Sequence, residues 1–402
     1  MTQVTPAEAE ALILAHMPRF PSREEPIADC VARVLAEDVV ADRDQPPFDR
    51  VTMDGIAIAY RDWQAGTRAF DVVGTQAAGA PALATTKPAQ CVEVMTGAML
   101  PRGTDTVIPV ERVERRAGAA SVVASTVVVA SRQFVHRRAA DRAAGSVVLP
   151  AGTRIGAPEM AVLANAGRPK VAVAALPRVA VISTGDELVD VGEPLAPYQI
   201  RSTNDRALEA GLARERLALV TRTRLPDDGA ALADAIARLD ETADALILSG
   251  GVSMGQFDLV PGVLQSLGAK LVFHRIRQRP GKPMWFGLSA RGKPIFALPG
   301  NPVSTLVCAT RYIMPALRQA LGERPGAPEL VALSEPSEAS QELTYFIPVK
   351  LASSAAGVLL AAPRPTNTSG DFVALAGTDG FVELPPRRGD HPPGTVARLY
   401  RW

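Results

Sequence analysis

The segment from Arg178 to about Leu321 alternates short apolar runs with helical patterns, and this alternation restricts the fold more than any other feature of the chain. The apolar runs, which indicate strands, lie at 179–183, 217–225, 246–249, 271–275 and 295–297. The helical patterns lie at about 203–216, 228–239, 260–267 and 303–320. Strands that alternate with helices pair in parallel, because each helical crossover returns the chain to the same end of the sheet. We therefore predict a three-layer, mostly parallel α/β domain over residues 178–326.

The loops at the strand ends of this domain are rich in glycine, proline and hydroxyl side chains. In an open α/β sheet, ligands bind outside the carboxyl ends of the strands. The four loops expected there are Ser183-Thr184-Gly185-Asp186-Glu187-Leu188, Ser249-Gly250-Gly251-Val252-Ser253-Met254-Gly255, Arg279-Pro280-Gly281-Lys282-Pro283 and Leu298-Pro299-Gly300-Asn301-Pro302-Val303-Ser304. Glycines at a strand end indicate a sharp turn or a close approach by another group. Several loops precede a helix N-terminus, where backbone N–H groups attract anions, so phosphate or another oxyanion is the expected ligand.

Two common phosphate motifs are excluded at these loops. Gly250 and Gly255 have the glycine spacing of a P-loop, but Gln256 and Phe257 stand where its Lys and Ser/Thr belong. No GxGxxG pattern follows the first strand, which excludes a dinucleotide fingerprint. A single loop of this kind is explained equally well as a tight turn with a helix cap. Four such loops on one sheet edge favour a ligand site.

Asp186 and Glu187 are adjacent carboxylates beside a predicted anion site. Such an arrangement favours a cation between the carboxylates and the anion, and Mg²⁺ is usually held by one or two carboxylates plus substrate phosphates. The alternative is that both are acidic residues at a helix start, where they complement the helix dipole.

The amino-acid composition argues against several classes of protein. Lys and Arg number 43 against 42 Asp and Glu, so no global field favours nucleic acid or an anionic membrane surface. The three cysteines lie far apart without a CxxC, which argues against a disulfide framework or a thiolate zinc site and favours a reducing compartment. No apolar run approaches 18 residues. We expect a cytoplasmic protein that binds neither nucleic acid nor membrane.

The flanking segments predict a multidomain α/β protein. Thr5-Pro6-Ala7-Glu8 is a capping box that opens a helix to about His16, and a second helix is expected over about 27–36. Residues 1–50 and 139–177 form an N-terminal linking α+β region, 51–138 a β-rich insertion, and 327–402 a small C-terminal β-barrel. The polar loops of the insertion, around Asp54, Thr96 and Asp141, suggest no chemistry from their spacing alone.

Six motifs together resemble one known family. They occur in the order PPFDRVTMDGIAI, TGAMLPRGTDTVIPVE, STGDEL, SGGVSMGQFD, RPGKP and LPGNPVS. This set is similar to that of the molybdopterin molybdenumtransferases, the metal-insertion enzymes of molybdenum cofactor synthesis. TGDEL or SGGVSxG alone would also fit the related molybdopterin adenylyltransferases, and a non-catalytic molybdopterin-binding scaffold is a third alternative.

The resemblance implies a four-domain subunit in a homodimer, with the active site between subunits. It implies that adenylyl-molybdopterin and molybdate are consumed and that molybdenum cofactor and AMP are produced, with Mg²⁺ or another divalent cation. It also suggests contacts with molybdopterin adenylyltransferase and with proteins that mature downstream molybdoenzymes. The C-terminal barrel has no chemistry that the sequence predicts.

The resemblance assigns roles to individual residues. The catalytic residues would be Asp54, Asp141, Asp186, Glu187 and Asp258, of which Asp186, Glu187 and Asp258 would hold the metal. Molybdate would be bound by Arg279, Lys282 and Ser304. The substrate-binding residues would be Thr96, Thr184, Gly185, Asn204, Asp228, Ser249, Gly250, Gly251, Ser253, Pro280, Gly281, Pro299, Gly300, Asn301 and Pro302.

Three departures from the family pattern are visible. Arg201 stands where many members carry an acid or an aromatic residue, and Val51-Thr52 replaces the commoner Ser-Ala. Asp141 is kept, but it lacks the usual preceding Gly-Glu.

Overall fold

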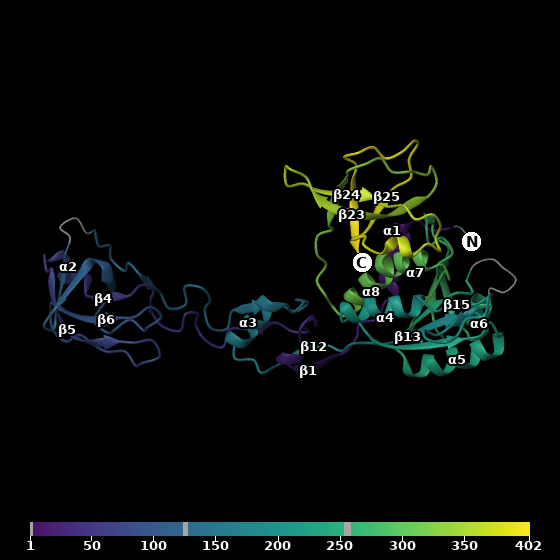
Figure 1. Cartoon of the computed structure of the whole chain (residues 1–402). Helices are drawn as coiled ribbons and strands as arrows, with labels where there is room; N and C mark the ends of the chain where they lie inside the picture. The colour runs from purple at the N-terminus through teal and green to yellow at the C-terminus, as the bar shows by residue number, and fades with distance from the viewer. Residues whose placement is uncertain (1–2, 124–127, 253–258) are drawn as a thin grey trace. The chain divides into compact units, whose positions relative to one another are not determined.

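The computed structural model describes residues 3–123, 128–252 and 259–402, and the chain divides into two compact units (Figure 1). The first unit comprises the residues up to Glu37, Ala151–Ala157 and Lys170–Trp402, and the second comprises Asp38–Pro150 and Pro158–Pro169. The predicted division into four domains is finer than this and stays a prediction. Within the described ranges, no helix is long and apolar enough to cross a membrane.

A six-stranded sheet forms the centre of the first unit, in the order β16-β13-β17-β21-β20-β18. Its strands are β13 (Arg178–Thr184), β16 (Leu219–Leu225), β17 (Ala245–Ser249), β18 (Lys270–His274), β20 (Trp285–Leu288) and β21 (Pro294–Leu298). β16, β13, β17 and β21 pair in parallel, whereas β20 runs antiparallel between β21 and β18. The sheet is therefore mostly parallel as predicted, with β20 as a strand that the sequence pattern did not indicate.

Helices cover both faces of this sheet. One face packs against α1 (Pro6–His16), α4 (Asn204–Arg214) and the segment of α7 (Pro302–Cys308), the π-helix η3 (Ala309–Ile313) and α8 (Met314–Ala320). The other face packs against α5 (Gly229–Thr242) and α6 (Val260–Ser266). The alternate residues of β13 explain this division, since Val179 and Val181 lie in the first cluster and Ala180 and Ile182 in the second. The predicted three-layer fold is confirmed.

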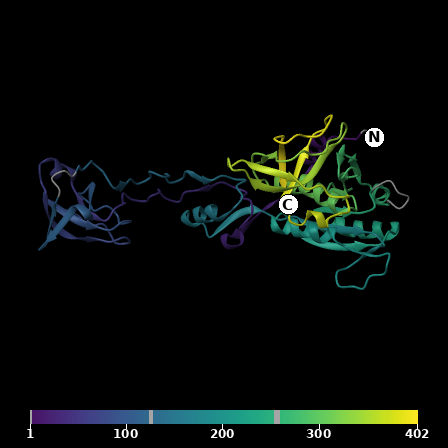
Figure 2. The ribbon, with the colours of Figure 1, turned by 45° about the horizontal axis from the view of Figure 1, so that its top comes forward.

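The C-terminal region is a closed five-stranded barrel, as predicted. Its order is β23-β24-β22-β26-β25, and β25 pairs back with β23. The elements are β22 (Leu330–Leu333), β23 (Thr344–Ser353), β24 (Leu359–Pro363), η4 (Val373–Leu375), β25 (Gly380–Leu384) and β26 (Val396–Arg401). The short strand β19 (Gln278–Arg279) of the α/β domain pairs in parallel with β23, which joins the barrel to the α/β domain. Figure 2 shows the barrel, in yellow and yellow-green, beside the green and teal α/β domain.

The N-terminal segment confirms one predicted helix and corrects another. The Thr5 side chain accepts the N–H of Glu8 and the Glu8 side chain accepts the N–H of Thr5, so the capping box that opens α1 is present. The helix predicted over 27–36 is wrong: only the 3₁₀ turn η1 (Ile27–Asp29) forms there. Val34 and Leu35 make isolated bridges to extended segments instead, so tertiary pairing overrides the local pattern. β1 (Ser22–Pro26) and β12 (Lys170–Ala174) pair antiparallel in the same region, and β14 (Leu188–Val189) pairs in parallel with β15 (Ile200–Arg201).

The second unit is built on another six-stranded sheet, in the order β7-β4-β6-β5-β9-β8. Its strands are β4 (Gly55–Ile58), β5 (Ala69–Gln76), β6 (Gln90–Val94), β7 (Thr106–Pro109), β8 (Val113–Arg116) and β9 (Ala119–Val122). The unit also contains β2 (Val39–Val40), β3 (Arg50–Val51), α2 (Tyr60–Gln64), η2 (Val110–Arg112), β10 (Val135–His136), β11 (Val147–Leu149) and nearly all of α3 (Ala157–Asn165). The β-rich character predicted for residues 51–138 agrees with these elements.

Candidate functional site

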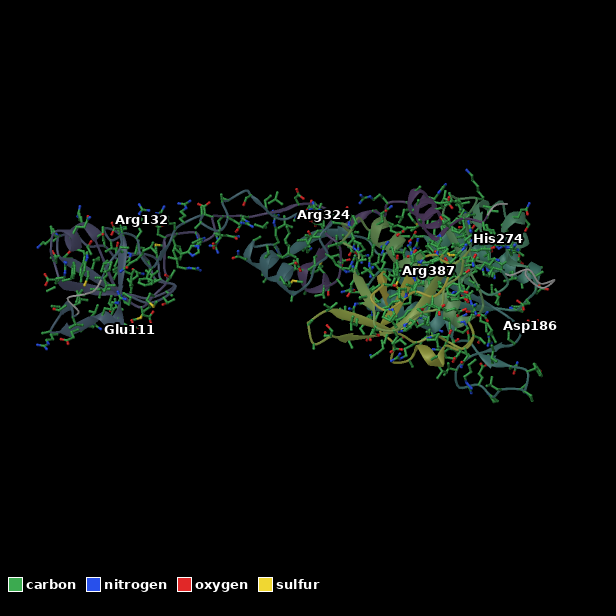
Figure 3. The ribbon with its side chains drawn as sticks, turned by 90° about the horizontal axis from the view of Figure 1, so that it is seen from above. Glu111, Arg132, Asp186, His274, Arg324 and Arg387 are labelled. Carbon is green, nitrogen blue, oxygen red and sulfur yellow. The ribbon has the colours of Figure 1, made fainter. Side chains whose placement is uncertain are left out.

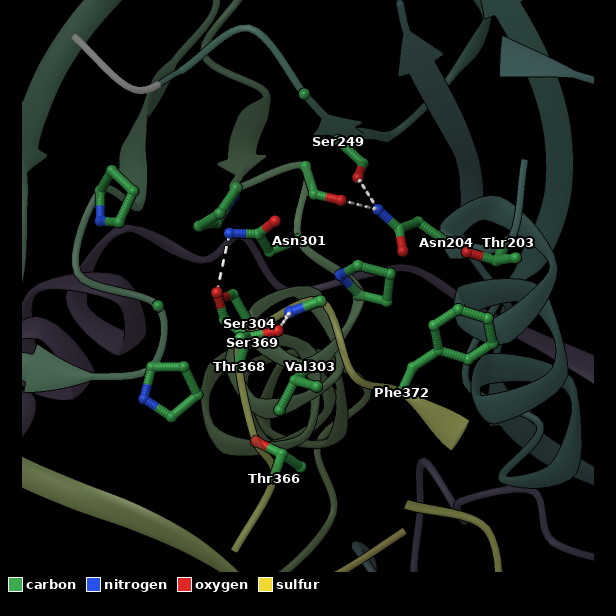
Figure 4. Close-up of a pocket in the computed structure, with 18 of the residues that line it drawn as sticks. Thr203, Asn204, Ser249, Asn301, Val303, Ser304, Thr366, Thr368, Ser369 and Phe372 are labelled. Atoms are coloured by element: carbon green, nitrogen blue, oxygen red, sulfur yellow. Dashed lines mark hydrogen bonds between the residues drawn. The ribbon is translucent and has the colours of Figure 1, made fainter. Parts of the chain in front are cut away.

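A cavity of about 1450 Å³ lies where the carboxyl ends of β13, β17 and β21 meet the C-terminal barrel. All four predicted strand-end loops contribute to its lining. Ser249, Asn301 and Ser304, from two of these loops, are labelled in Figure 4. The site residues predicted from the sequence that line this cavity are Thr184, Gly185, Glu187, Asn204, Ser249, Gly250, Gly251, Arg279, Pro280, Gly281, Lys282, Pro299, Gly300, Asn301, Pro302 and Ser304. Segments far apart in the sequence therefore meet at one cavity.

Asn204 connects three of these segments. It is the first residue of α4, and its side-chain nitrogen donates to the Ser249 hydroxyl at 2.7 Å and to the Gly300 carbonyl at 2.8 Å (Figure 4). The position of Asn204 depends on the next residue, Asp205, whose carboxylate accepts hydrogen bonds from Ser202 and Arg222. Burial raises the pKa of Asp205, but these hydrogen bonds outweigh it and hold the pKa below its ordinary value. The start of α4 is thus anchored by an ionised buried carboxylate.

The glycines after β17 permit close packing between two loops. Gly250 has φ +105°, and a Cβ placed on it would lie 2.6 Å from the backbone oxygen of Thr184. Gly251 has φ +63°, and its Cβ would lie 2.9 Å from Cγ2 of Val260. The group that approaches these glycines is therefore protein, from the end of β13 and from α6. Glycine is needed here for the backbone conformation and for the space.

The RPGKP loop rests on a buried polar scaffold. Gln278 is fully buried, donates from Nε2 to the Pro280 carbonyl at 2.9 Å, and accepts a hydrogen bond from the Tyr312 hydroxyl. Gly281, at φ +91°, packs so tightly that a Cβ would lie 2.5 Å from the Cys308 Sγ. Burial raises the pKa of Tyr312 and raises that of Cys308 to about 12, so the scaffold stays uncharged at neutral pH.

The two cations of this loop lie at the edge of the cavity. The Arg279 Nη1 donates to the Tyr345 hydroxyl at 3.3 Å, and its guanidinium lies 5.5 Å from the centroid of the Tyr345 ring. Lys282 is exposed, and the structure shows no ion pair for it among the residues it describes. One cation is thus oriented by the barrel, and the other presents its ammonium to solvent at the cavity.

A loop of the C-terminal barrel completes the cavity, and the sequence analysis missed it. The residues concerned are Pro365, Thr366, Asn367, Thr368, Ser369, Gly370 and Phe372. The Asn301 side chain donates to the Ser369 hydroxyl at 2.8 Å, and the backbone N–H of Val303 donates to the Ser369 carbonyl at 3.1 Å (Figure 4). Small polar residues with a glycine indicate a turn, so the sequence signal was present but did not show where the turn lies.

The predicted carboxylates are placed differently from one another. Glu187 lines the cavity, whereas Asp186 does not; its carboxylate accepts the N–H of Asp227 at 3.1 Å, and Figure 3 places Asp186 at the periphery of the unit. Asp228 caps α5 by accepting the N–H of Ala231 at 2.7 Å and does not line the cavity, unlike its neighbour Asp227.

The predicted metal site involves residues that are only partly described. Asp258, a predicted metal ligand, lies outside the described residues, as does Ser253, which was predicted to bind substrate. Over the described part of the chain, no group of three or more His, Cys, Asp or Glu side chains is placed to hold a metal ion. The three-carboxylate metal site therefore stays a prediction.

The remaining predicted residues belong to the second unit. The Asp54 carboxylate accepts hydrogen bonds from the Thr96 hydroxyl at 2.7 Å and from the Thr96 backbone N–H at 2.6 Å, and these hold the pKa of Asp54 below its ordinary value. Asp141 instead pairs with Nε2 of His136 at 3.0 Å. The structure thus brings Asp54 and Thr96 together, and it gives Asp141 a histidine partner that the sequence analysis did not identify.

Three family models match successive parts of the chain. They are the MoeA N-terminal region (domain I and II) over residues 4–167, the probable molybdopterin binding domain over 180–319, and the MoeA C-terminal region (domain IV) over 331–402. A molybdopterin molybdenumtransferase from Synechocystis sp. is 38% identical over 405 residues, which cover 99% of this chain and 100% of that protein. The chain belongs to the molybdopterin molybdenumtransferase family.

Other members of the molybdopterin molybdenumtransferase family agree with this assignment. The protein of that name from Bacillus subtilis is 32% identical, over 89% of this chain and 85% of its own length. The crystal structure of a molybdopterin biosynthesis MoeA protein from Pyrococcus horikoshii matches with a TM-score of 0.85 and 26% identity over 100% of both chains. The predicted family, the predicted fold class and the prediction of a transferase in molybdenum cofactor biosynthesis are confirmed.

Proposed function

We propose that the chain transfers molybdenum from molybdate to adenylyl-molybdopterin and forms molybdenum cofactor. In this reaction an oxygen from water or molybdate adds at a phosphorus as the phosphoanhydride P–O bond breaks, and the adenylate leaves as AMP. The two dithiolene sulfurs replace two oxygens of molybdate, so that one water is released overall and the oxidation state of molybdenum does not change. The observation that carries the proposal is a single cavity that collects the RPGKP cations, the Glu187 carboxylate and the Asn204–Ser249 hydrogen bond. Family membership supports the class of reaction, and this cavity supports the substrate.

The size of the cavity supports a large substrate. Ligand pockets usually enclose about 300–1,000 Å³, whereas this cavity measures about 1450 Å³. It has room for a pterin that carries a nucleotide and for a second, small anion beside it. Adenylyl-molybdopterin with molybdate is such a combination.

The cation-bearing side of the cavity supports molybdate binding. Molybdate is a tetrahedral dianion like sulfate, and charged donors bind such anions with short, strong hydrogen bonds. Arg279 and Lys282 supply positive charge at the cavity, and Ser304 supplies a hydroxyl from α7. The fixed orientation of Arg279 against Tyr345 reduces the loss of side-chain entropy when an oxyanion binds.

The carboxylates of the β13 loop support a divalent cation. Carboxylate oxygens suit Mg²⁺, which commonly takes one or two of them and completes its coordination with phosphate oxygens and water. Glu187 lines the cavity and would hold the ion on the substrate side. Asp186 is its neighbour in the sequence and would be a second ligand, for which its carboxylate would have to exchange the N–H of Asp227 for the ion. When bound there, Mg²⁺ would polarise the phosphoanhydride as a Lewis acid.

We also propose a homodimer in which the second unit of one subunit contributes to the site of the other. The support is the Asp54–Thr96 pair, an ionised carboxylate held at the surface of the second unit by two hydrogen bonds. A surface carboxylate that is fixed in this way is ready to act on a ligand supplied from outside its own unit. Cytoplasmic location and docking of other cofactor-synthesis proteins remain expectations from the sequence.

Two alternatives are disfavoured by particular observations. A molybdopterin adenylyltransferase would use the α/β domain alone, but here a loop of the C-terminal barrel lines the same cavity and hydrogen-bonds Asn301. A non-catalytic scaffold would not need the carboxylate of Glu187 in the cavity or the ionised Asp54.

The test is AMP release by the purified full-length chain. The protein is incubated anaerobically with adenylyl-molybdopterin and Mg²⁺, with and without molybdate, and AMP is quantified. We expect molybdate-dependent release that falls at least tenfold in Glu187→Gln. Glu241→Gln is the matched control, because Glu241 is an exposed carboxylate on α5 that pairs with Arg291 away from the cavity. Binding without release would leave a pterin carrier. A parallel incubation with ATP, molybdopterin and Mg²⁺ tests the other alternative, because release of inorganic pyrophosphate there would identify an adenylyltransferase.

A further inference from the structure

One wall of the cavity is apolar and accessible. Leu195, and Ile200 at the start of β15, are both exposed and both line the cavity. Phe372 of the barrel loop also lines it and leaves 41% of its surface exposed. Exposed apolar side chains that gather in a concave site, rather than lying singly on a surface, indicate contact with an apolar part of a ligand.

Phe372 is the accessible aromatic ring of this wall. Among the described residues, the other aromatic side chains of the cavity are Tyr345 and Phe346, which are 8% and 1% exposed. The Tyr345 hydroxyl is already hydrogen-bonded by Arg279, and Phe346 lies in the hydrophobic cluster between α7 and the barrel. Of these three aromatic residues, Phe372 is therefore the one that is substantially accessible to a ligand.

The backbone that carries Phe372 is held on both sides. Before it, Ser369 is bonded to Asn301 and to the N–H of Val303. After it, the buried Leu375 donates its N–H to the Phe372 carbonyl at 3.0 Å and packs in the cluster that contains Val303. The backbone position of Phe372 is thus fixed, which lowers the entropy lost when a ligand stacks on its ring.

The surroundings of the ring match a flat heterocycle. In Figure 4 the Phe372 side chain extends from the barrel loop towards Thr203 and Asn204 at the start of α4. A purine or a pterin has an aromatic face that stacks on phenyl rings and an edge of nitrogen and oxygen atoms that needs hydrogen-bond partners. The Phe372 ring would supply the face contact, and the Thr203 hydroxyl before α4 and the side-chain oxygen of Asn204 would supply partners for the edge.

We propose that Phe372 is the residue on which the planar heteroaromatic ring of the substrate stacks. This inference rests on the proposed function, because it assumes that a pterin nucleotide occupies the cavity. The shared chemistry is a flat nitrogen heterocycle, and the adenine and the pterin of adenylyl-molybdopterin are its two sources. The barrel loop then binds substrate directly, in addition to closing the cavity.

The test is the equilibrium dissociation constant of the full-length protein for three separate ligands, measured anaerobically without molybdate. They are adenylyl-molybdopterin, molybdopterin and AMP. Because aromatic stacking of one base changes affinity by about 5- to 150-fold, we expect Phe372→Ala to weaken adenylyl-molybdopterin binding within that range. Phe372→Tyr should keep nearly wild-type affinity. Phe372→Leu should lose most of it, since leucine keeps apolar area but has no aromatic face.

A control variant and the pattern of losses across the three ligands separate the possible outcomes. Val373→Ala changes the next residue, which is exposed but does not line the cavity, and should leave all three constants unchanged. A loss shared with AMP places adenine on the ring, and a loss shared with molybdopterin places the pterin there. If Phe372→Ala or Phe372→Leu binds adenylyl-molybdopterin as tightly as the wild type, the stacking role is wrong while the proposed function stands. If the wild type binds none of the three ligands, the proposed function fails and this inference falls with it.

Discussion

The Tyr312 hydroxyl should be essential to the stability of the RPGKP scaffold. Tyr312 is buried on η3 and donates to Oε1 of Gln278, which is itself fully buried. Replacing Tyr312 by Phe keeps the ring and removes this donor, so a buried carbonyl oxygen loses its partner. Leaving a buried acceptor unsatisfied costs about 1–3 kcal/mol. We therefore expect Tyr312→Phe to lower the free energy of unfolding of the first unit by about that amount.

The assay is urea unfolding followed by tryptophan fluorescence. The three tryptophans are Trp63 in the second unit and Trp285 and Trp402 in the first, so a Trp63→Phe background reports on the first unit alone. With a urea m value of about 3 kcal/mol per molar, the midpoint should fall by about 0.3–1 M. Tyr198→Phe is the matched control, because Tyr198 is 78% exposed and its hydroxyl is solvated.

A double-mutant cycle decides whether the effect comes from this hydrogen bond. Gln278→Leu removes the acceptor, and it also removes the donor to the Pro280 carbonyl. In the double variant the buried acceptor no longer exists, so Tyr312→Phe should cost about 1 kcal/mol less than it does alone. The reasoning would be refuted if Tyr312→Phe and Tyr198→Phe unfolded at the same urea concentration. It would also be refuted if the effects of Tyr312→Phe and Gln278→Leu on the free energy of unfolding were additive.

Three further predictions concern the loops and helix α4. Gly250→Ala should lower the free energy of unfolding by about 2 kcal/mol more than Gly357→Ala in calorimetry, because both glycines have positive φ but only the Cβ at Gly250 would meet backbone atoms. The Asp205–Arg222 pair should stabilise the fold above the unfolded pKa of the aspartate, near 3.8, and lose its effect as the pH falls through the lower folded pKa. In urea titrations, Arg222→Met should therefore lower the free energy of unfolding by its full amount at pH 7 and by less below about pH 4. A loss of unfolding free energy that does not change with pH would contradict the assignment. Asn204→Ala should lower the free energy of unfolding by about 1–2 kcal/mol in the same titrations, because the Ser249 hydroxyl and the Gly300 carbonyl lose the donor that they share.

The local pattern of the sequence determined the main architecture. Apolar runs of strand length, helical periodicity and the capping box at Thr5 and Glu8 depend on neighbouring residues, and each leads to one structure. The strand-end loops could be placed at one edge because parallel strands end on the same side of a sheet. The helix that was wrongly predicted over 27–36 shows the limit, since Val34 and Leu35 pair with distant segments instead. The antiparallel strand β20 (Trp285–Leu288) pairs with its neighbours β18 and β21 and was missed by the sequence pattern for a different, local reason.

The tertiary structure alone decided what the loops contact. The sequence showed that Gly250 needed space, but the approaching group proved to be the backbone of Thr184 on a neighbouring strand. Ser369 and Phe372 reach the cavity only because the barrel docks on the α/β domain through β19 and β23. Local patterns describe a residue's own backbone and its nearest neighbours along the chain, whereas a site is assembled by packing between segments that are far apart in the sequence.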